Sequence, residues 1–133
     1  MTVNLPDTFE LLETGTNSEL LLSRDLTGAV HLVLKTVDVS HSRECNHLLN
    51  EYEILQRLQH ENIVRPLGFW KEVVLVGSRR SVLILPIAKH RSLLTMVKTR
   101  RLLVAEVREL FGQVARAVAH LHSNDLIHRD IKL

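Results

Sequence analysis

The chain has 133 residues, of which 45% are hydrophobic and 24% are charged, and its formal net charge is +2. This composition is typical of a folded globular domain and excludes a chain that is disordered throughout. The basic residues lie in short, separate clusters without interleaved aromatic side chains, so we expect no nucleic-acid-binding surface.

The only cysteine, Cys45, allows no internal disulfide bond, and we expect it to be a packing or surface residue. The N-terminal segment lacks the basic and apolar stretches of a signal peptide. No apolar run approaches the roughly 20 residues of a membrane span. We therefore expect a soluble cytoplasmic protein, with the nucleus as an alternative location, that does not bind membranes.

The first half of the chain predicts strands joined by turns. The first three strands are expected at residues 9–15, 18–25 and 29–37. The turns between them are expected at Gly15–Asn17 and Asp25–Gly28. Farther along, Pro66 and Gly68 are expected to interrupt regular structure. Two apolar runs, 72–77 and 81–87, then predict a hairpin whose turn is Ser78–Arg80.

Three segments have helical periodicity. The first, residues 42–59, places Leu48, Leu55 and Leu58 on one side of a 3.6-residue repeat. The other two are expected at 92–99 and 104–123. The predicted order is β-β-β-α-β-β-α-α, an α+β fold in which a helix packs on an antiparallel sheet and a helical section follows.

Lys35 and Glu51 are candidates for an ion pair. Lys35 lies within an apolar strand, where lysine is rarely buried without a partner. At about 100° per residue, Glu51 lies about 60° from Leu48 on the helix and about 20° from Leu58, so it points into the apolar stripe. Packing of the helix on the sheet would bring the two charges together. An outward-facing lysine and an unpaired glutamate remain alternatives.

The chain closes with the string "HRDIKL" at residues 128–133. An aspartate two residues before a lysine suits phosphoryl transfer. The carboxylate can orient a hydroxyl and accept its proton, and the ammonium can neutralise phosphate charge. A solvated polar loop is the alternative interpretation of these residues.

These motifs together resemble the eukaryotic protein-kinase family. The string "HRDIK" is similar to the family's catalytic loop, and "LVLK" at 32–35 is similar to its Val-Ala-Ile-Lys motif. The strings "NEYEIL" and "LQHENIVRPLGF" resemble its C helix and the strand that follows. Similarity also covers "VLILPIAKHRSL", at the fifth strand and hinge, and the long helix before the catalytic loop. The resemblance extends over about residues 9–133.

The resemblance implies a protein-kinase-like fold. We expect a five-stranded antiparallel N-lobe sheet with its C helix, followed by a helical C-lobe fragment that contains the D and E helices. The expected boundaries are 1–88 for the N-lobe and hinge and 89–133 for the C-lobe fragment. The resemblance further implies ATP and Mg²⁺, and a protein substrate or protein partner.

The resemblance also implies residue roles. Lys35 would hold the α- and β-phosphates of ATP, with Glu51 as its ion-pair partner. Asp130 would be the catalytic aspartate and Lys132 the lysine near the transferred phosphate, a spacing more similar to serine/threonine kinases than to tyrosine kinases. The remaining nucleotide-binding positions would be Gly15 in the phosphate-binding turn, Val33 against the adenine ring, the gatekeeper Leu85, and the hinge residues Pro86 and Ala88.

The sequence departs from the family in its phosphate-binding turn and near its end. The aligned stretch "ETGTNSEL" retains only Gly15, while Glu13 and Ser18 stand at the outer glycine positions, so we expect weak or altered nucleotide affinity. Val33 is bulkier than the usual alanine. The family's metal-binding asparagine would fall at position 135 and its Asp-Phe-Gly motif later, so no metal ligand is assigned.

We therefore expect the N-terminal part of a serine/threonine protein kinase, inactive as a 133-residue chain by itself. The apolar stripe of the helix at 104–123 would then be exposed, which predicts either poor solubility or a partner that covers it. The alternative is a pseudokinase-like protein-interaction module with weak or no nucleotide binding. A third interpretation is an unrelated α+β domain whose motifs match by chance.

Overall fold

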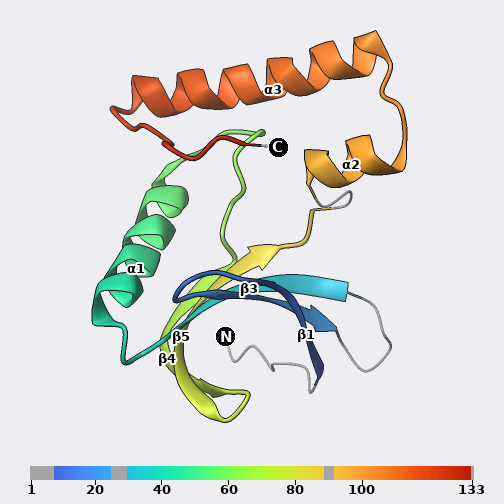
Figure 1. The fold of residues 1–133 in the computed structure, drawn as a ribbon. Helices are drawn as coiled ribbons and strands as arrows, with labels where there is room; N and C mark the ends of the chain where they lie inside the picture. The colour runs from blue at the N-terminus through green and yellow to red at the C-terminus, as the bar shows by residue number, and fades with distance from the viewer. Residues whose placement is uncertain (1–7, 25–29, 89–91, 133) are drawn as a thin grey trace. The chain divides into compact units, whose positions relative to one another are not determined.

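The computed structural model describes residues 8–24, 30–88 and 92–132 (Figure 1). Its elements follow one another as β1 (Thr8–Thr14), β2 (Glu19–Arg24), β3 (Val30–Asp38), α1 (Ser42–Arg57), β4 (Gly68–Leu75), β5 (Ser78–Pro86), α2 (Leu93–Thr99) and α3 (Val104–Ser123). The predicted order of strands and helices is confirmed. The expected turn at Asp25–Gly28 lies outside the described residues.

The five strands form one antiparallel sheet in the order β1-β2-β3-β5-β4. Short turns make hairpins of β1–β2 and β4–β5, while α1 connects β3 to β4 and leaves room for β5 between them. In the central ladder Lys35 lies opposite Leu20 on one side and Leu83 on the other. The predicted five-stranded antiparallel sheet is therefore present.

Each face of the sheet buries an apolar cluster, because side chains alternate between the faces of a strand. One cluster is formed by strand residues alone, with Leu34 and Val82 fully buried at its centre. The other joins Val37 and Leu83 of the sheet to Leu48 of α1. This second cluster attaches α1 to the face that also carries Lys35.

The hairpin between β4 and β5 differs from the sequence prediction. Its turn is Val76–Gly77, with φ of 48° and 76°, and residues 78–80 belong to β5. A two-residue turn of this kind needs positive φ at both central positions, which Gly77 adopts without strain. Gly68 is likewise not a breaker but the first residue of β4, opposite Ile84.

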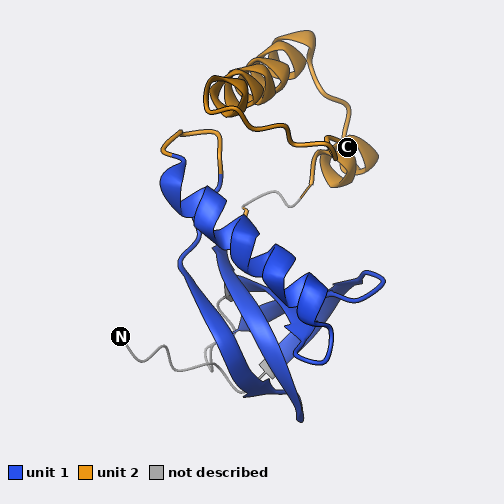
Figure 2. Ribbon diagram, turned by 90° about the vertical axis from the view of Figure 1, so that its left-hand side faces the viewer, with its two compact units in different colours: residues 1–58, 64–87 blue, residues 59–63, 88–133 orange. Residues whose placement is uncertain are grey.

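The chain forms two compact units, one of residues 1–58 and 64–87 and the other of 59–63 and 88–133 (Figure 2). The first unit contains the sheet and α1. In the second unit, the loop after α1 contacts α3, where the His60 and His120 rings lie 5.0 Å apart between centroids. The loop at 59–63 therefore packs with the helical section, although it follows α1 in the sequence.

In the second unit, α2 and α3 begin with different capping interactions. Ser92 caps α2 by accepting a hydrogen bond from the Thr95 backbone N–H at 3.2 Å. At α3, the Glu106 carboxylate accepts the backbone N–H of Leu103 at 2.8 Å. Phe111 on α3 is 59% exposed, and Val107 and Val114 are exposed too, so part of the apolar stripe expected for this helix lies at the surface. None of the helices in the described ranges combines the length and apolar character that spanning a bilayer requires.

Candidate functional site

Lys35 and Glu51 form the ion pair expected from the sequence. Lys35 shares a face of β3 with the buried Val37, and Glu51 follows Leu48 by one turn of α1. The Lys35 Nζ atom lies 2.6 Å from Glu51 Oε2, and the two side chains are 34% and 38% exposed. The cluster around Leu48 thus positions an ammonium and a carboxylate against each other at a partly open surface.

The partial exposure of the Lys35–Glu51 pair limits its contribution to the free energy of folding. A pair with this much solvent access contributes about 1 kcal/mol or less to folding, because water screens both charges. The Lys35 ammonium has three donors, and Glu51 uses one of them. Lys35 can therefore contact a further anion while Glu51 holds its side chain in place.

Val33 and Leu85 lie beside Lys35 on the same face of the sheet. They are directly opposite each other in the β3–β5 ladder, and both are half-buried. Leu85 packs against the cluster that contains Leu48. Cross-strand neighbours of this kind form a continuous apolar surface. The first unit therefore places an apolar patch next to a partly exposed ammonium.

Pro86 and Ala88, the two expected hinge residues, are both exposed. Pro86 is the last residue of β5 and lies opposite Leu32. Ala88 belongs to the second compact unit. The structure thus gathers Val33, Lys35, Glu51 and Leu85 on one side of the first unit, with Pro86 at the end of the same strand as Leu85.

The turn that contains Gly15 is tight. The Gly15 N–H donates to the Ser18 carbonyl oxygen at 2.7 Å. A Cβ atom added at Gly15 would lie only 2.8 Å from Ser18 Oγ, so a side chain would require the Ser18 hydroxyl to move. Glycine therefore leaves the Ser18 hydroxyl in place within this turn.

Sequence reasoning missed a contact between this turn and α1. Asn17 Nδ2 donates to Glu44 Oε1 at 2.9 Å, although the two residues are 27 positions apart. The pKa of Glu44 lies below its usual value, first because of a hydrogen bond from its own backbone N–H and then because of the Asn17 amide. Neither hydrophobic periodicity nor a local motif indicates this contact.

Asp130 and Lys132 lie together in the loop after α3. Lys132 Nζ is 3.3 Å from Asp130 Oδ2, and the side chains are 73% and 72% exposed. The Asp130 N–H donates to His128 Nδ1 at 3.2 Å. Arg129 between them has a φ of 65°, an uncommon conformation for a residue with a side chain and one that is enriched at functional sites.

The residues of the first unit fit the phosphate and base of a nucleotide in part. The Lys35 ammonium suits a phosphate oxygen, and the Val33–Leu85 patch suits a flat ring. The carboxylates of Glu44 and Glu51 lie close by and oppose a polyanion. Within residues 8–24, 30–88 and 92–132, no group of three or more His, Cys, Asp or Glu side chains is arranged to hold a metal.

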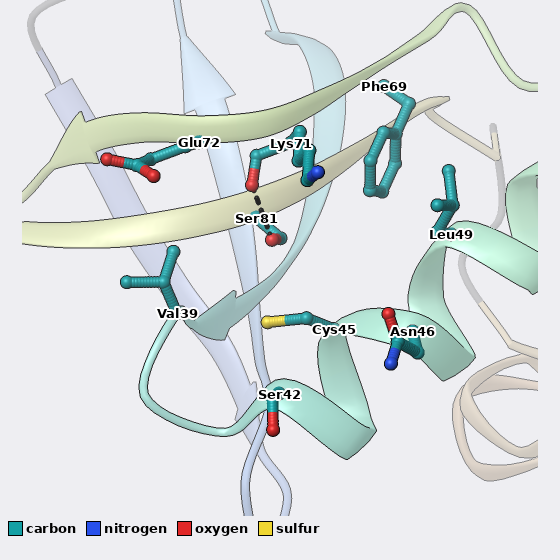
Figure 3. A pocket seen from close by; sticks show the side chains of 9 residues that line it. All are labelled: Val39, Ser42, Cys45, Asn46, Leu49, Phe69, Lys71, Glu72 and Ser81. Atoms are coloured by element: carbon teal, nitrogen blue, oxygen red, sulfur yellow. Dashed lines mark hydrogen bonds between the residues drawn. The ribbon is translucent and has the colours of Figure 1, made fainter.

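A separate cavity of about 240 Å³ lies between α1 and strands β4 and β5 (Figure 3). Cys45 and Phe69 supply part of its apolar wall, while Lys71 and Ser81 come from the strands. None of the site residues predicted from the sequence lines it. Cys45 is half-buried, packs against the cluster around Leu48 and donates its thiol to the Asp38 carbonyl at 3.5 Å, so its expected packing role is confirmed.

Comparisons with known proteins agree on one family. The protein kinase domain family model matches residues 7–133. The chain is 28% identical over 137 residues to human NUAK family SNF1-like kinase 2, covering 98% of this chain and 21% of that protein. It is 31% identical over 131 residues to mouse sperm motility kinase 3A, covering 93% of this chain and 24% of that protein.

A solved structure shows the same fold. The crystal structure of Rad53 1-466 in complex with AMP-PNP matches with a TM-score of 0.68 and 22% sequence identity, over 93% of this chain and 33% of that chain. The chain thus spans 21% and 24% of the length of the two curated relatives named above. Because the family model covers nearly all residues, the chain belongs to the protein kinase domain family.

Proposed function

We propose that this chain is the nucleotide-binding part of a serine/threonine protein kinase, which transfers the γ-phosphate of ATP to a protein hydroxyl. The observation that carries the proposal is the 2.6 Å contact between Lys35 and Glu51, in a chain of the protein kinase family. The adjoining Val33–Leu85 patch supports an adenine site there, and Pro86 and Ala88 would supply its hinge contacts. Rad53, whose fold this chain shares, was solved with AMP-PNP.

In the proposed site, Glu51 acts on Lys35 rather than on ATP. A lysine side chain loses considerable conformational entropy when it is held in one geometry. The Glu51 carboxylate holds the ammonium before nucleotide arrives, so less of that entropy is lost on binding. Lys35 would then neutralise charge on the α- and β-phosphates.

Asp130 and Lys132 are proposed as the catalytic pair. The Asp130 carboxylate would orient the attacking hydroxyl and accept its proton, and Lys132 would stabilise charge on the transferred phosphate. Their 3.3 Å separation supports placing both groups in one site. In a complete site Mg²⁺ would neutralise phosphate charge, and no group of three or more His, Cys, Asp or Glu side chains among the described residues is arranged to hold it.

We also propose that residues 1–88 act as the nucleotide lobe and hinge and residues 89–133 as the beginning of the substrate-binding lobe. A polypeptide limited to residues 1–133 lacks the metal-binding residues of the family, so we propose that it transfers no phosphate by itself. Mg-ATP-dependent phosphorylation by that polypeptide, abolished by Asp130→Asn, would contradict this part of the proposal.

A second candidate function is a pseudokinase-like protein-interaction module. It is favoured by Glu13 and Ser18, which stand where the family has phosphate-binding glycines. Phe111, at 59% exposure on α3, would be part of the surface that meets a protein partner. In this alternative, nucleotide binds weakly or not at all.

Isothermal titration with AMP-PNP, with and without Mg²⁺, distinguishes the two functions. We compare the unmodified chain with Lys35→Ala, and use Lys71→Ala, an exposed lysine on β4, as the matched control. Loss of a charge-assisted contact predicts about a tenfold or greater decrease in affinity for Lys35→Ala and little change for Lys71→Ala. Equal affinities of all three proteins would refute the nucleotide site, and undetectable binding would favour the interaction module.

A further inference from the structure

The turn between β1 and β2 is attached to the first helical turn of α1. Asn17 on the turn donates to Glu44 on α1 at 2.9 Å, and both residues are half-buried. The turn is also closed internally by the 2.7 Å bond between Gly15 and Ser18. The turn is therefore fixed by one hydrogen bond within itself and by another to α1.

The attached turn and α1 line a small, open pocket beside the Lys35–Glu51 pair. The pocket has a volume of about 150 Å³ and is lined by Ser18 of the turn, Lys35 of β3, and Glu44, His47 and Glu51 of α1. Sites for drug-sized ligands are roughly 300–1,000 Å³. The pocket is therefore smaller than a site for a whole nucleotide, and Ser18 of the attached turn lines the approach to Lys35.

The charges around the pocket also disfavour a polyphosphate. Two carboxylates, Glu44 and Glu51, face one ammonium, Lys35. Asn17 is neutral, so its hydrogen bond adds no positive charge beside Glu44. An anion that approaches Lys35 from the side of the turn meets the Glu44 carboxylate in addition to the attached turn.

We propose that the Asn17–Glu44 hydrogen bond is a latch that holds the β1–β2 turn against α1 and restricts the access of nucleotide phosphates to Lys35. The proposal rests on the proposed nucleotide site. It adds that affinity is limited by the position of the turn as well as by the replaced glycines.

Three substitutions distinguish the effect of the Asn17–Glu44 hydrogen bond from the effect of the Glu44 charge. Asn17→Ala removes the hydrogen bond and leaves both carboxylates. Glu44→Gln removes the charge, while its side-chain oxygen can still accept from Asn17. Thr16→Ala, at an exposed neighbouring position of the same turn, changes neither and is the control.

The test is titration of the whole 133-residue chain with AMP-PNP, together with amide hydrogen exchange at residues 15–18 without nucleotide. One hydrogen bond is worth about 0.5–1.5 kcal/mol, so Asn17→Ala should strengthen binding by about twofold to tenfold and speed exchange in the turn. Thr16→Ala should change neither. Glu44→Gln should strengthen binding without faster exchange.

Failure of the latch and failure of the nucleotide site give different results. If Lys35→Ala weakens binding but Asn17→Ala leaves affinity or exchange unchanged, the latch is overturned and the nucleotide site stands. If Lys35→Ala has no effect, the nucleotide site itself is overturned, and the latch proposal with it.

Discussion

Replacing Val76 by asparagine should stabilise the protein. Val76 has a φ of 48° at the first position of the β4–β5 turn, and Gly77 follows with a φ of 76°. The left-handed conformation costs a residue with a side chain about 1–2 kcal/mol, and β-branched residues are poorly suited to it. Asparagine tolerates this conformation, and Asn-Gly is a favoured pair for such turns.

The exposure of Val76 limits how much favourable apolar burial the substitution removes. Val76 is 70% exposed, so less than a third of its surface is buried. Burying a whole valine side chain is worth about 1.5–3 kcal/mol, and the substitution therefore removes less than about 1 kcal/mol of apolar burial. The expected net gain is about 0.5–1 kcal/mol, or a rise in Tm of roughly 2–5 °C for a chain of this size.

Thermal and urea unfolding followed by circular dichroism measure this gain. Val74→Asn is the matched control, because Val74 on β4 is also 70% exposed but is not among the residues with positive φ. Asparagine is depleted in strands, so the control should be neutral or destabilising. If Val76→Asn is no more stable than Val74→Asn, the argument from backbone strain is wrong.

Three further predictions concern buried groups and pH. The Ser23 hydroxyl is buried without a hydrogen-bond partner among the described residues, so Ser23→Ala should raise the unfolding free energy by about 1 kcal/mol in urea titrations, and a loss would show that the hydroxyl is satisfied. Leu83 is fully buried between the sheet and α1, so Leu83→Ala should cost about 2–5 kcal/mol, whereas Leu11→Ala, at 56% exposure, should cost much less. Arg100, followed by the Leu103 N–H, lowers the pKa of Glu106 from 4.5 to about 2. Because the folded-state pKa is depressed, this contribution to stability is complete above pH 4.5 and is lost as the pH falls toward 2. Helicity at the start of α3, followed by NMR, should therefore decrease over this range, and Glu106→Gln should remove that part of the pH dependence.

Local patterns predicted the elements well where the hydrophobic pattern was strong. They placed the β4–β5 turn wrongly, because Ser78, Arg79 and Arg80 form a polar run that is typical of loops. In the structure Arg80 belongs to β5, where it pairs with Glu19 and donates to Thr36 Oγ1 at 3.0 Å. Glu19 lies 61 residues away in the sequence, so no local pattern indicates that this arginine is accommodated within the sheet.

The candidate site was likewise predictable where its contacts depend on local features of the sequence. The angle of Glu51 on its helix and the place of Lys35 within an apolar strand indicated their contact, since both are local features of the sequence. The attachment of Asn17 to Glu44 was not predictable, because it depends on the conformation of a turn that has no repeating pattern. The Asp130–Lys132 contact follows from a spacing of two residues in one loop.

The proposed function requires Lys35 to bind the phosphates of a nucleotide. An acyl-phosphate derivative of ATP, which acylates lysine amines near the bound phosphates, tests this directly when the labelled lysines are identified by mass spectrometry. We predict that Lys35 is labelled preferentially, that ATP competes with the labelling, and that Lys71 is labelled only at the background rate. Equal labelling of Lys35 and Lys71, with no competition by ATP, would contradict the account.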